Sequence, residues 1–290
     1  MMKSLWILSI SLGSILLLCP AQSAENPIIF AEDFEDNSLQ EWDADSTLND
    51  PSRLRITDNP DHVFHGKYAA EFTLQEGRDN GVKLNKWFMP GFDRIYARFY
   101  AKFAEDFDQG NLMHWAHVMG NRVDNKWSSF GQAGKRPTGE DFFSIGIEPW
   151  RAWGKFPPPG NISFYTYHMD MPIDPKTNKY YGQQYFPEQP FVIERGRWYC
   201  YEIMVKANTP DKSDGEQILW IDGNKLIHST GLRFRSSDQV RMNGFWLSLY
   251  IHDNPKTNTC WYDELVISHE PVGPLSVPSA VEAAPVHADQ

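Results

Sequence analysis

Short segments in which hydrophobic residues recur at every second position follow one another along the chain, separated by clusters of Gly, Pro, Asn and Asp. This period of two is typical of β-strands that bury one face, and no heptad, long amphipathic helix or internal repeat is present. The predicted strands cover 28–34, 53–57, 67–74, 95–103, 111–119, 142–148, 161–169, 198–206, 217–222, 225–228, 244–252 and 260–268. Many short strands joined by turns predict one all-β domain, a β-sandwich or jelly roll.

In five of these strands the alternation separates an apolar face from an aromatic and polar one. In 244–252, for example, Phe245 and Leu247 lie on one face, whereas Trp246 and Tyr250 lie on the other. The second faces of 95–103, 111–119, 142–148, 161–169 and 244–252 include Arg98, Trp115, His117, Glu148, Tyr165, Tyr167, Trp246, Tyr250 and His252. We expect the five strands to share a sheet whose second face is the floor of a sugar-binding groove. His114 is expected on the apolar face, with a hydrogen bond inside the core.

Two long loops flank these strands and are expected to form the rims of the groove. Residues 120–141 are rich in Gly, Lys and Arg, and residues 170–194 are rich in Pro, Tyr and Gln. Long loops in a compact domain are often functional. Six basic and four acidic residues give segment 122–155 a local charge of +2 within a chain of net charge −11. We therefore expect Arg122, Lys135, Arg136 and Trp150 to contact an anionic polysaccharide.

Composition narrows the classes of ligand. The 290 residues include 11 Trp, 12 Tyr and 18 Phe, which favour strands and supply surfaces on which sugar rings stack. The strongly acidic net charge argues against nucleic acid as a partner, because the overall field would repel phosphates. We expect a monomer that binds polysaccharide.

The N-terminus has the pattern of an export signal. Lys3 precedes an apolar run, and small residues follow at Ala21-Gln22-Ser23, so residues 1–23 are expected to be a cleaved signal peptide. The run is too short for a membrane span, and Cys19 follows leucines, which disfavours lipid attachment. The protein is therefore expected to be secreted or periplasmic. In such an oxidising compartment Cys200 and Cys260 are expected to form a disulfide.

Several motifs together give the chain a resemblance to a known group. They are Trp127-Ser128-Ser129-Phe130-Gly131-Gln132-Ala133-Gly134, Arg136-Pro137-Thr138-Gly139, Ile147-Glu148-Pro149-Trp150, Phe164-Tyr165-Thr166-Tyr167, Gly196-Arg197-Trp198-Tyr199-Cys200, Lys206-Ala207-Asn208-Thr209-Pro210, Asp214-Gly215-Glu216, Trp220-Ile221-Asp222-Gly223 and Tyr262-Asp263. Over residues 30–270 the chain resembles exported bacterial polysaccharide-lyase-like proteins with a concanavalin-A-like jelly roll. Their distant relatives are alginate, glucuronan and heparin lyases. The domain is expected to span residues 24–270, and residues 271–290 are expected to form a disordered tail.

The resemblance implies β-elimination on a uronic-acid polysaccharide. This reaction needs a base for the proton beside the carboxylate, an acid for the leaving oxygen and a group that neutralises the carboxylate. The catalytic candidates are His117 as base, Tyr165 or Tyr167 as acid and base partner, and Arg98 or Arg122 as neutraliser. The lysine-bearing Gly-Lys-Leu-Pro motif of the alginate lyases is absent, and residues 110–117 occupy the equivalent stretch.

Two other functions are compatible with the sequence. One is a non-catalytic carbohydrate-binding protein, favoured by the missing lysine motif. The other is a glycoside hydrolase, which needs two facing carboxylates, whereas Glu148 is alone among the outward strand residues. No cofactor is expected to be required. A structural calcium ion is a further hypothesis, because Glu35 near the first strand and Asp263 near the last could meet where the terminal strands pair.

Overall fold

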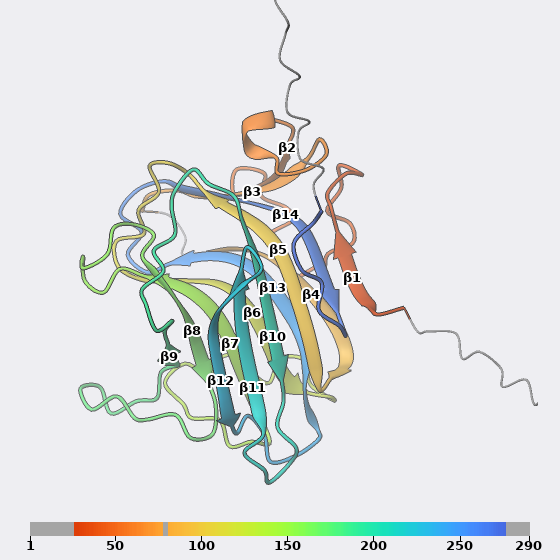
Figure 1. Ribbon diagram of the computed structural model, residues 1–290, viewed down its shortest axis with the longest axis vertical. Coiled ribbons are helices and arrows are strands. Elements are labelled where there is room, and N and C mark those ends of the chain that lie inside the picture. The colour runs from red at the N-terminus through yellow and green to blue at the C-terminus, as the bar shows by residue number, and fades with distance from the viewer. Residues whose placement is uncertain (1–25, 78–80, 277–290) are drawn as a thin grey trace, which may run out of the picture.

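The computed structural model describes residues 26–77 and 81–276 and consists almost entirely of β-strands (Figure 1). Residues 1–23, for which a signal peptide is predicted, lie outside the described residues, as do residues 277–290 of the predicted tail. One short 3-10 helix, Pro60–His62, interrupts the strands. Nothing helical in the described ranges has the length and apolar character needed to cross a membrane.

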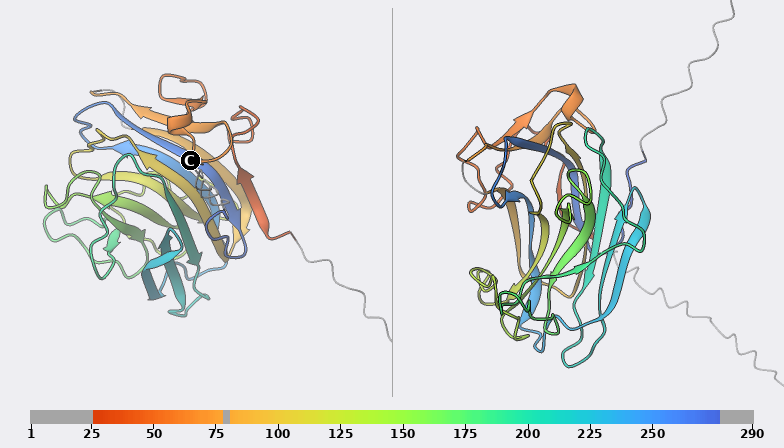
Figure 2. Two further views of the ribbon diagram at one scale, coloured as in Figure 1. Left: turned by 45° about the horizontal axis from the view of Figure 1, so that its top comes forward. Right: turned by 90° about the vertical axis from the view of Figure 1, so that its left-hand side faces the viewer.

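Two antiparallel sheets pack face to face as a β-sandwich (Figure 2). The eight-stranded sheet contains β1 (Ile28–Glu32), β2 (Leu54–Thr57), β3 (Ala69–Leu74), β5 (Arg94–Phe103), β10 (Tyr199–Lys206), β11 (Gly215–Ile221), β12 (Asn224–Leu232) and β14 (Asn258–Ser268). The six-stranded sheet contains β4 (Gly81–Phe92), β6 (Met113–Arg122), β7 (Phe142–Trp150), β8 (Asn161–Tyr167), β9 (Gln183–Tyr185) and β13 (Val240–Ile251). The all-β sandwich expected from the sequence is confirmed.

The core lies between the two sheets and is formed by the apolar faces that alternation predicted. Phe99 of β5 faces Phe245 of β13 across the sandwich, with ring centroids 6.1 Å apart. Burying such side chains stabilises the fold by about 1.5–3 kcal/mol each, before the cost of ordering them. The opposite face of the six-stranded sheet is thereby left for aromatic and polar side chains.

The order of strands corrects one expectation about the predicted groove. The six-stranded sheet runs β4-β13-β6-β7-β8-β9, whereas β5 lies in the other sheet between β10 and β14. Alternation therefore assigned residues 95–103 to the right faces but not to the right sheet. The outward residues of β5, including Arg98, lie on the side of the molecule away from the six-stranded sheet.

Strands β4 and β9 were not predicted from the sequence. β4 contains Pro90 and Gly91 together with two lysines, a composition that weakens any strand signal. It forms an edge of the six-stranded sheet, where a proline leaves no ladder hydrogen bond unmade. β9 has three residues and is the opposite edge. Both edges contribute residues to the candidate site.

The alternation breaks in β6, at the floor of the six-stranded sheet. Trp115 and Ala116 both point into the core, and the pairing of β6 with β13 shifts between Leu247 and Tyr250. The hydroxyl of Ser248 donates a hydrogen bond to the carbonyl of Trp115 at this point. Such irregularities re-aim side chains, and here His114 and Trp115 exchange the faces that strict alternation gives them. The predictions that Trp115 binds substrate and that His114 lies in the core are therefore wrong.

The predicted disulfide is also wrong, because both cysteines are free and buried. Cys200 pairs with Tyr100 and lies on the outer face of the eight-stranded sheet. Cys260 pairs with Phe103 and belongs to the core between the sheets. Side chains on opposite faces of one sheet cannot form an unstrained bridge. Burial raises the pKa of Cys200 to about 11 and that of Cys260 to about 12.

The start of the predicted tail is ordered instead of disordered. The backbone N–H groups of Val272 and Gly273 donate hydrogen bonds to the carboxylate of Glu202, at 2.8 and 3.0 Å. The N–H of Leu275 donates to the hydroxyl of Tyr100 at 2.8 Å. Residues 271–276 therefore lie along the outer face of the eight-stranded sheet.

Replacing Trp115 by Ala is expected to lower the free energy of unfolding by about 3–5 kcal/mol, because a large side chain leaves a closely packed core. The matched change Trp153→Ala, at a residue that is 80% exposed, is expected to change it by no more than about 0.5 kcal/mol. Urea unfolding followed by tryptophan fluorescence measures both values. Equal effects of the two changes would show that Trp115 is not part of the core.

Alkylation provides a second test of the fold. In the native protein Cys200 and Cys260 are expected to resist iodoacetamide at neutral pH, because both thiols are buried and their raised pKa keeps them protonated. Both should react once the chain is unfolded in denaturant. Peptide mapping by mass spectrometry identifies the labelled residues. A peptide pair linked through Cys200 and Cys260 would contradict their placement on opposite faces of the sheet.

Candidate functional site

A large cleft of about 1070 Å³ opens on the face of the six-stranded sheet that points away from the core. Its floor consists of side chains from β6, β7, β8 and β13, and its edges come from β4, β9 and the neighbouring loops. The polar and aromatic residues that line it include Arg53, Lys83, Asn111, His114, His117, Phe130, Gln132, Glu148, Trp150, Trp153, Tyr165, Tyr167, Tyr181, Gln184, Trp246, Ser248, Tyr250 and His252. Apolar and polar groups are mixed in the way that ligand-binding clefts require.

A buried carboxylate lies at the centre of the floor. Glu148 of β7 is only 4% exposed. Its Oε1 lies 2.6 Å from Nδ1 of His114 and 3.2 Å from Nε2 of His117. The ring of His114 also contacts His252, whose Nε2 lies 3.2 Å from Nε2 of His114. Three histidines and one glutamate thus form a connected cluster.

The charges of this cluster are coupled. Burial by itself would lower the pKa of His114, but the charge and hydrogen bond of Glu148 outweigh burial and raise it. Burial likewise would raise the pKa of Glu148, and the two histidines hold it below its usual range. The pKa of His252 is lowered by burial and by the nearby charge of His114. Glu148 and His114 therefore favour an ion pair, beside a neutral His252.

A glycine makes room for His117. Pairing across the sheet places Trp246, His117, Gly146 and Tyr165 in one row on the cleft face. A Cβ atom on Gly146 would lie 2.4 Å from Nε2 of His117, well inside contact distance. The absence of a side chain at 146 thus allows His117 to lean over β7 and reach Glu148.

Two tyrosines of β8 border the cluster. The ring centroids of Tyr165 and Tyr167 are 5.7 Å apart, and that of Tyr165 is 5.5 Å from that of His114. Burial raises the pKa of both tyrosines, most strongly that of Tyr165. Both phenols are therefore protonated near neutral pH and can donate a proton or a hydrogen bond to a bound ligand.

Aromatic groups stand at two places around the cluster. At one, Trp246 lies beside Phe130 with ring centroids 5.2 Å apart, and Nζ of Lys83 lies 4.8 Å from the Trp246 ring. At the other, the rings of Trp150 and Trp153 lie 5.1 Å apart. The non-glycine residue Trp153 has a φ of 55°, an unfavourable conformation that is often retained at functional sites. These surfaces suit the stacking of sugar rings.

The structure brings together most of the residues for which a role was predicted. His117, Glu148, Trp150, Tyr165, Tyr167, Trp246, Tyr250 and His252 all line the cleft. Their individual roles stay predictions, because position alone does not test them.

The predicted cationic residues are placed elsewhere. Arg98 is buried on the outer face of the other sheet, where its guanidinium donates to the carbonyl of Glu264 at 2.6 Å. Arg122 lies outside the cleft lining and donates to both carboxylate oxygens of Asp124 at 2.8 Å. Lys135 and Arg136 are exposed on the rim loop and do not line the cleft either. The expectation that Arg98 meets the substrate is therefore wrong, whereas a contact of Arg122, Lys135 or Arg136 with substrate stays a prediction.

Several residues that line the cleft were not predicted from the sequence. Lys83 lies on the unpredicted strand β4, and His114 was assigned to the wrong face because the irregularity in β6 was not foreseen. Trp153 follows β7 directly and could have been found as part of the Trp-rich segment 150–153. Gln184 lies on the three-residue strand β9, for which the sequence offers no periodic signal.

The two acids proposed to bind calcium each accept backbone hydrogen bonds from one loop. Glu35 Oε1 accepts from the N–H groups of Lys67 and Tyr68, at 2.8 and 2.9 Å. Asp263 Oδ2 accepts from those of Phe64 and His65, at 2.9 and 3.1 Å. These contacts give both carboxylates a role in holding residues 64–68. Calcium binding there stays a prediction.

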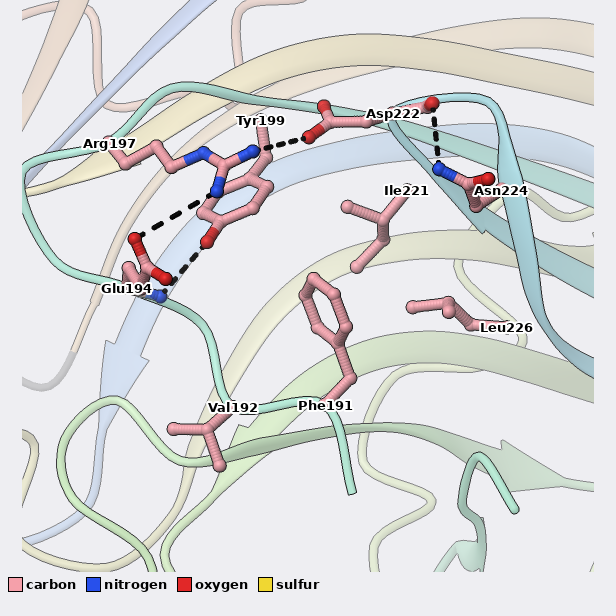
Figure 3. Close-up of a pocket in the computed structure, with 9 residues that line it drawn as sticks. All are labelled: Phe191, Val192, Glu194, Arg197, Tyr199, Ile221, Asp222, Asn224 and Leu226. Carbon is pink, nitrogen blue, oxygen red and sulfur yellow. Dashed lines mark hydrogen bonds and ion pairs between the residues drawn. The ribbon is translucent and has the colours of Figure 1, made fainter. Parts of the chain in front are cut away.

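A smaller pocket of about 220 Å³ lies at one end of the eight-stranded sheet (Figure 3). The charged side chains that line this pocket form ion pairs with one another. The guanidinium of Arg197 lies 3.2 Å from the carboxylate of Asp222 and 3.9 Å from that of Glu194, and it stacks over Tyr199. The large cleft, with its coupled histidines and acid, is therefore the candidate functional site.

A Gly146→Ala substitution tests the geometry of the floor. The added methyl group is expected to push the His117 ring away and break its 3.2 Å contact with Glu148, while the sheet stays in place. The sheet can persist because the clash is with the end of a side chain. Ser144→Ala, on the same face of β7, is the control and should leave His117 unmoved. Crystal structures of both variants measure the distance between His117 and Glu148. A Gly146→Ala structure in which His117 still contacts Glu148 would contradict the expectation.

Comparisons with known proteins concern the fold and one segment of the chain. A family model described as polysaccharide lyase 14 matches residues 150–252, the segment that carries Tyr165, Trp246 and His252. The search of curated proteins finds no significant match.

Solved structures share the fold over most of the chain. The marine alginate lyase of Aplysia kurodai superposes with a TM-score of 0.61 at 14% identity, covering 85% of this chain and 99% of that one. An alginate lyase from a Chlorella virus gives 0.60 at 14% identity, covering 83% and 99%. An endo-β-1,4-glucuronan lyase of Trichoderma reesei gives 0.55 at 16% identity, covering 84% and 96%. The resemblance to polysaccharide-lyase-like proteins with a jelly-roll fold, inferred from the sequence motifs, is thereby confirmed.

Proposed function

We propose that the protein is a polysaccharide lyase that cleaves a uronic-acid-containing polysaccharide by β-elimination in the large cleft. The observation that carries this proposal is the convergence of Tyr165 with His114, His117, His252 and Glu148 on one sugar-sized site. The match to the polysaccharide lyase 14 model and the fold shared with alginate and glucuronan lyases support it.

Tyr165 is assigned as the acid that protonates the leaving oxygen. Its phenol is kept protonated by burial, and its ring lies against the histidine cluster. A protonated group that loses its proton only as the bond to the leaving oxygen breaks is what this step needs.

His252 is assigned as the base, in place of His117. Nε2 of His117 lies against Glu148, and its Nδ1 is buried without a hydrogen-bond partner, so neither nitrogen is presented to a substrate. His252 is exposed in the cleft, and its lowered pKa leaves it neutral near pH 7. A neutral imidazole is the form that can accept the proton beside the uronate carboxylate.

The cleft also fits a polymer and disfavours hydrolysis. Aromatic surfaces at Trp246 and at Trp150 offer stacking positions for more than one sugar of a chain. Glu148 is the only acid among the described residues that line the cleft, and it is held by two histidines. A glycoside hydrolase needs two carboxylates that face the scissile bond.

The proposal is tested by incubating the protein with alginate, glucuronan, pectate and glycosaminoglycans. Unsaturated uronate ends, which absorb at about 235 nm, are expected with at least one of these polymers because β-elimination leaves a conjugated double bond. Tyr165→Phe should lower kcat by ~100-fold or more, the usual contribution of a general acid. Tyr96→Phe, on the outer face of the other sheet, is the matched control and should leave kcat unchanged.

No rise in absorbance with any polymer would overturn the proposal. If the protein then bound one of these polymers, with affinity lost in Trp246→Ala, the cleft would be a carbohydrate-binding site without catalysis. Wild-type turnover by Tyr165→Phe would remove Tyr165 from the reaction.

A further inference from the structure

Three potential metal ligands converge at the floor of the cleft. Nδ1 of His114, Nε2 of His117 and Oε1 of Glu148 lie within 4.8 Å of one another, the one such group of His, Cys, Asp or Glu within the described residues. Two imidazoles and one carboxylate are the ligand set of zinc in several hydrolytic enzymes, where three protein ligands leave a position open. All three residues line the cleft, so the open position would face the bound polymer.

The negative charge of Glu148 at the floor of the cleft is a second observation that favours a bound cation. A uronate polymer is an anion, yet Glu148 places a buried negative charge at the centre of the cleft. A protonated His114 only cancels this charge, and Arg98 lies on the far side of the molecule. Among the described residues, the two other basic residues that line the cleft are each paired with an acid. Nζ of Lys83 lies 3.7 Å from a carboxylate oxygen of Asp45, and Nε of Arg53 lies 2.9 Å from one of Asp50. A divalent ion held by neutral histidines and Glu148 would give the floor a net positive charge of one, which β-elimination requires beside the carboxylate.

Two independent departures from a regular sheet build this group. The irregularity at Trp115 and Ala116 turns His114 to the cleft, so that residues 114 and 117 lie on one face although three positions separate them. Gly146 then leaves the space through which His117 reaches Glu148. A regular β6 would turn His114 away from the cleft, and a side chain at position 146 would push His117 away from Glu148.

We propose that His114, His117 and Glu148 bind a divalent transition-metal ion, Zn²⁺ above all, at the floor of the cleft. The ion's open position takes the carboxylate of the uronate substrate, while His252 and Tyr165 remain for proton transfer. The binding of the ion stands by itself, whereas its contact with a uronate rests on the proposed function. A bound ion of this kind would depart from the expectation from the sequence that no cofactor is required.

Metal binding is measured on the full protein after removal of metal with a chelator and dialysis. Isothermal titration with Zn²⁺ is expected to show a single site. Glu148→Gln and His117→Gln should each weaken it by more than ~100-fold, since even the loss of an outer-shell partner costs up to ~100-fold. His228→Gln, whose histidine pairs with Glu216 on the other sheet, is the control and should bind as the wild type does. Co²⁺ in place of Zn²⁺ should give intense visible absorption of a four-coordinate site, lost in the same two variants.

Thermal unfolding of each variant shows that it is folded before its binding is compared. Zn²⁺ affinity that is absent from the folded wild type, or unchanged in folded Glu148→Gln, would overturn the metal site. Full lyase turnover by protein that binds no Zn²⁺ would overturn it while leaving the proposed function intact. If Zn²⁺ binding is lost in Glu148→Gln while the wild type cleaves no polyuronate, the metal site is supported and the proposed lyase activity is contradicted.

Discussion

A buried carboxylate, that of Glu148, is the constraint on which the candidate site depends. A charge removed from water costs several kcal/mol unless hydrogen bonds and opposite charge offset that cost. In this protein two histidines meet one oxygen of Glu148, and a third histidine contacts the first. His114 and His117 thereby offset the cost of burying that carboxylate, and His252 contacts it only through His114.

The sandwich supplies the rigid support for this arrangement. The six-stranded sheet buries one face against the other sheet, so the alternate side chains of β7, β8 and β13 are fixed on the opposite face. Edge strand β4 adds Lys83 on one side, and the short strand β9 adds Gln184 on the other. The cleft is therefore the exposed face of a sheet whose other face is a packed core, which keeps its floor well ordered.

The sequence predicted well which side chains share a face of a strand, and less well which strands lie next to each other. Alternation correctly separated Phe245 from Trp246 and Ile147 from Glu148, because the period of two is a property of a single strand. It could not tell which sheet contains residues 95–103, since strand order depends on contacts distant in sequence, and Arg98 was misplaced for that reason. Strand β4 was missed because an edge strand tolerates Pro90 and polar residues that central strands exclude.

The irregularity in β6 lies beyond what a periodic pattern can show. An extra residue reverses the faces on one side of it relative to the other, so His114 and Trp115 were both assigned to the wrong face although His117 was assigned correctly. The predicted disulfide was wrong for a related reason. An even number of cysteines gives no information on which face of a sheet each one occupies.

Residues 271–276, which lie along the outer face of the eight-stranded sheet, have a practical consequence for handling the protein. The chain reaches residue 276 on the side opposite the cleft, and β1 with residue 28 joins that same sheet. A protein coupled to a bead, a sensor chip or a fusion partner near residue 276 would therefore present its cleft to the solution. Long, viscous polysaccharide chains could then enter from the unobstructed side.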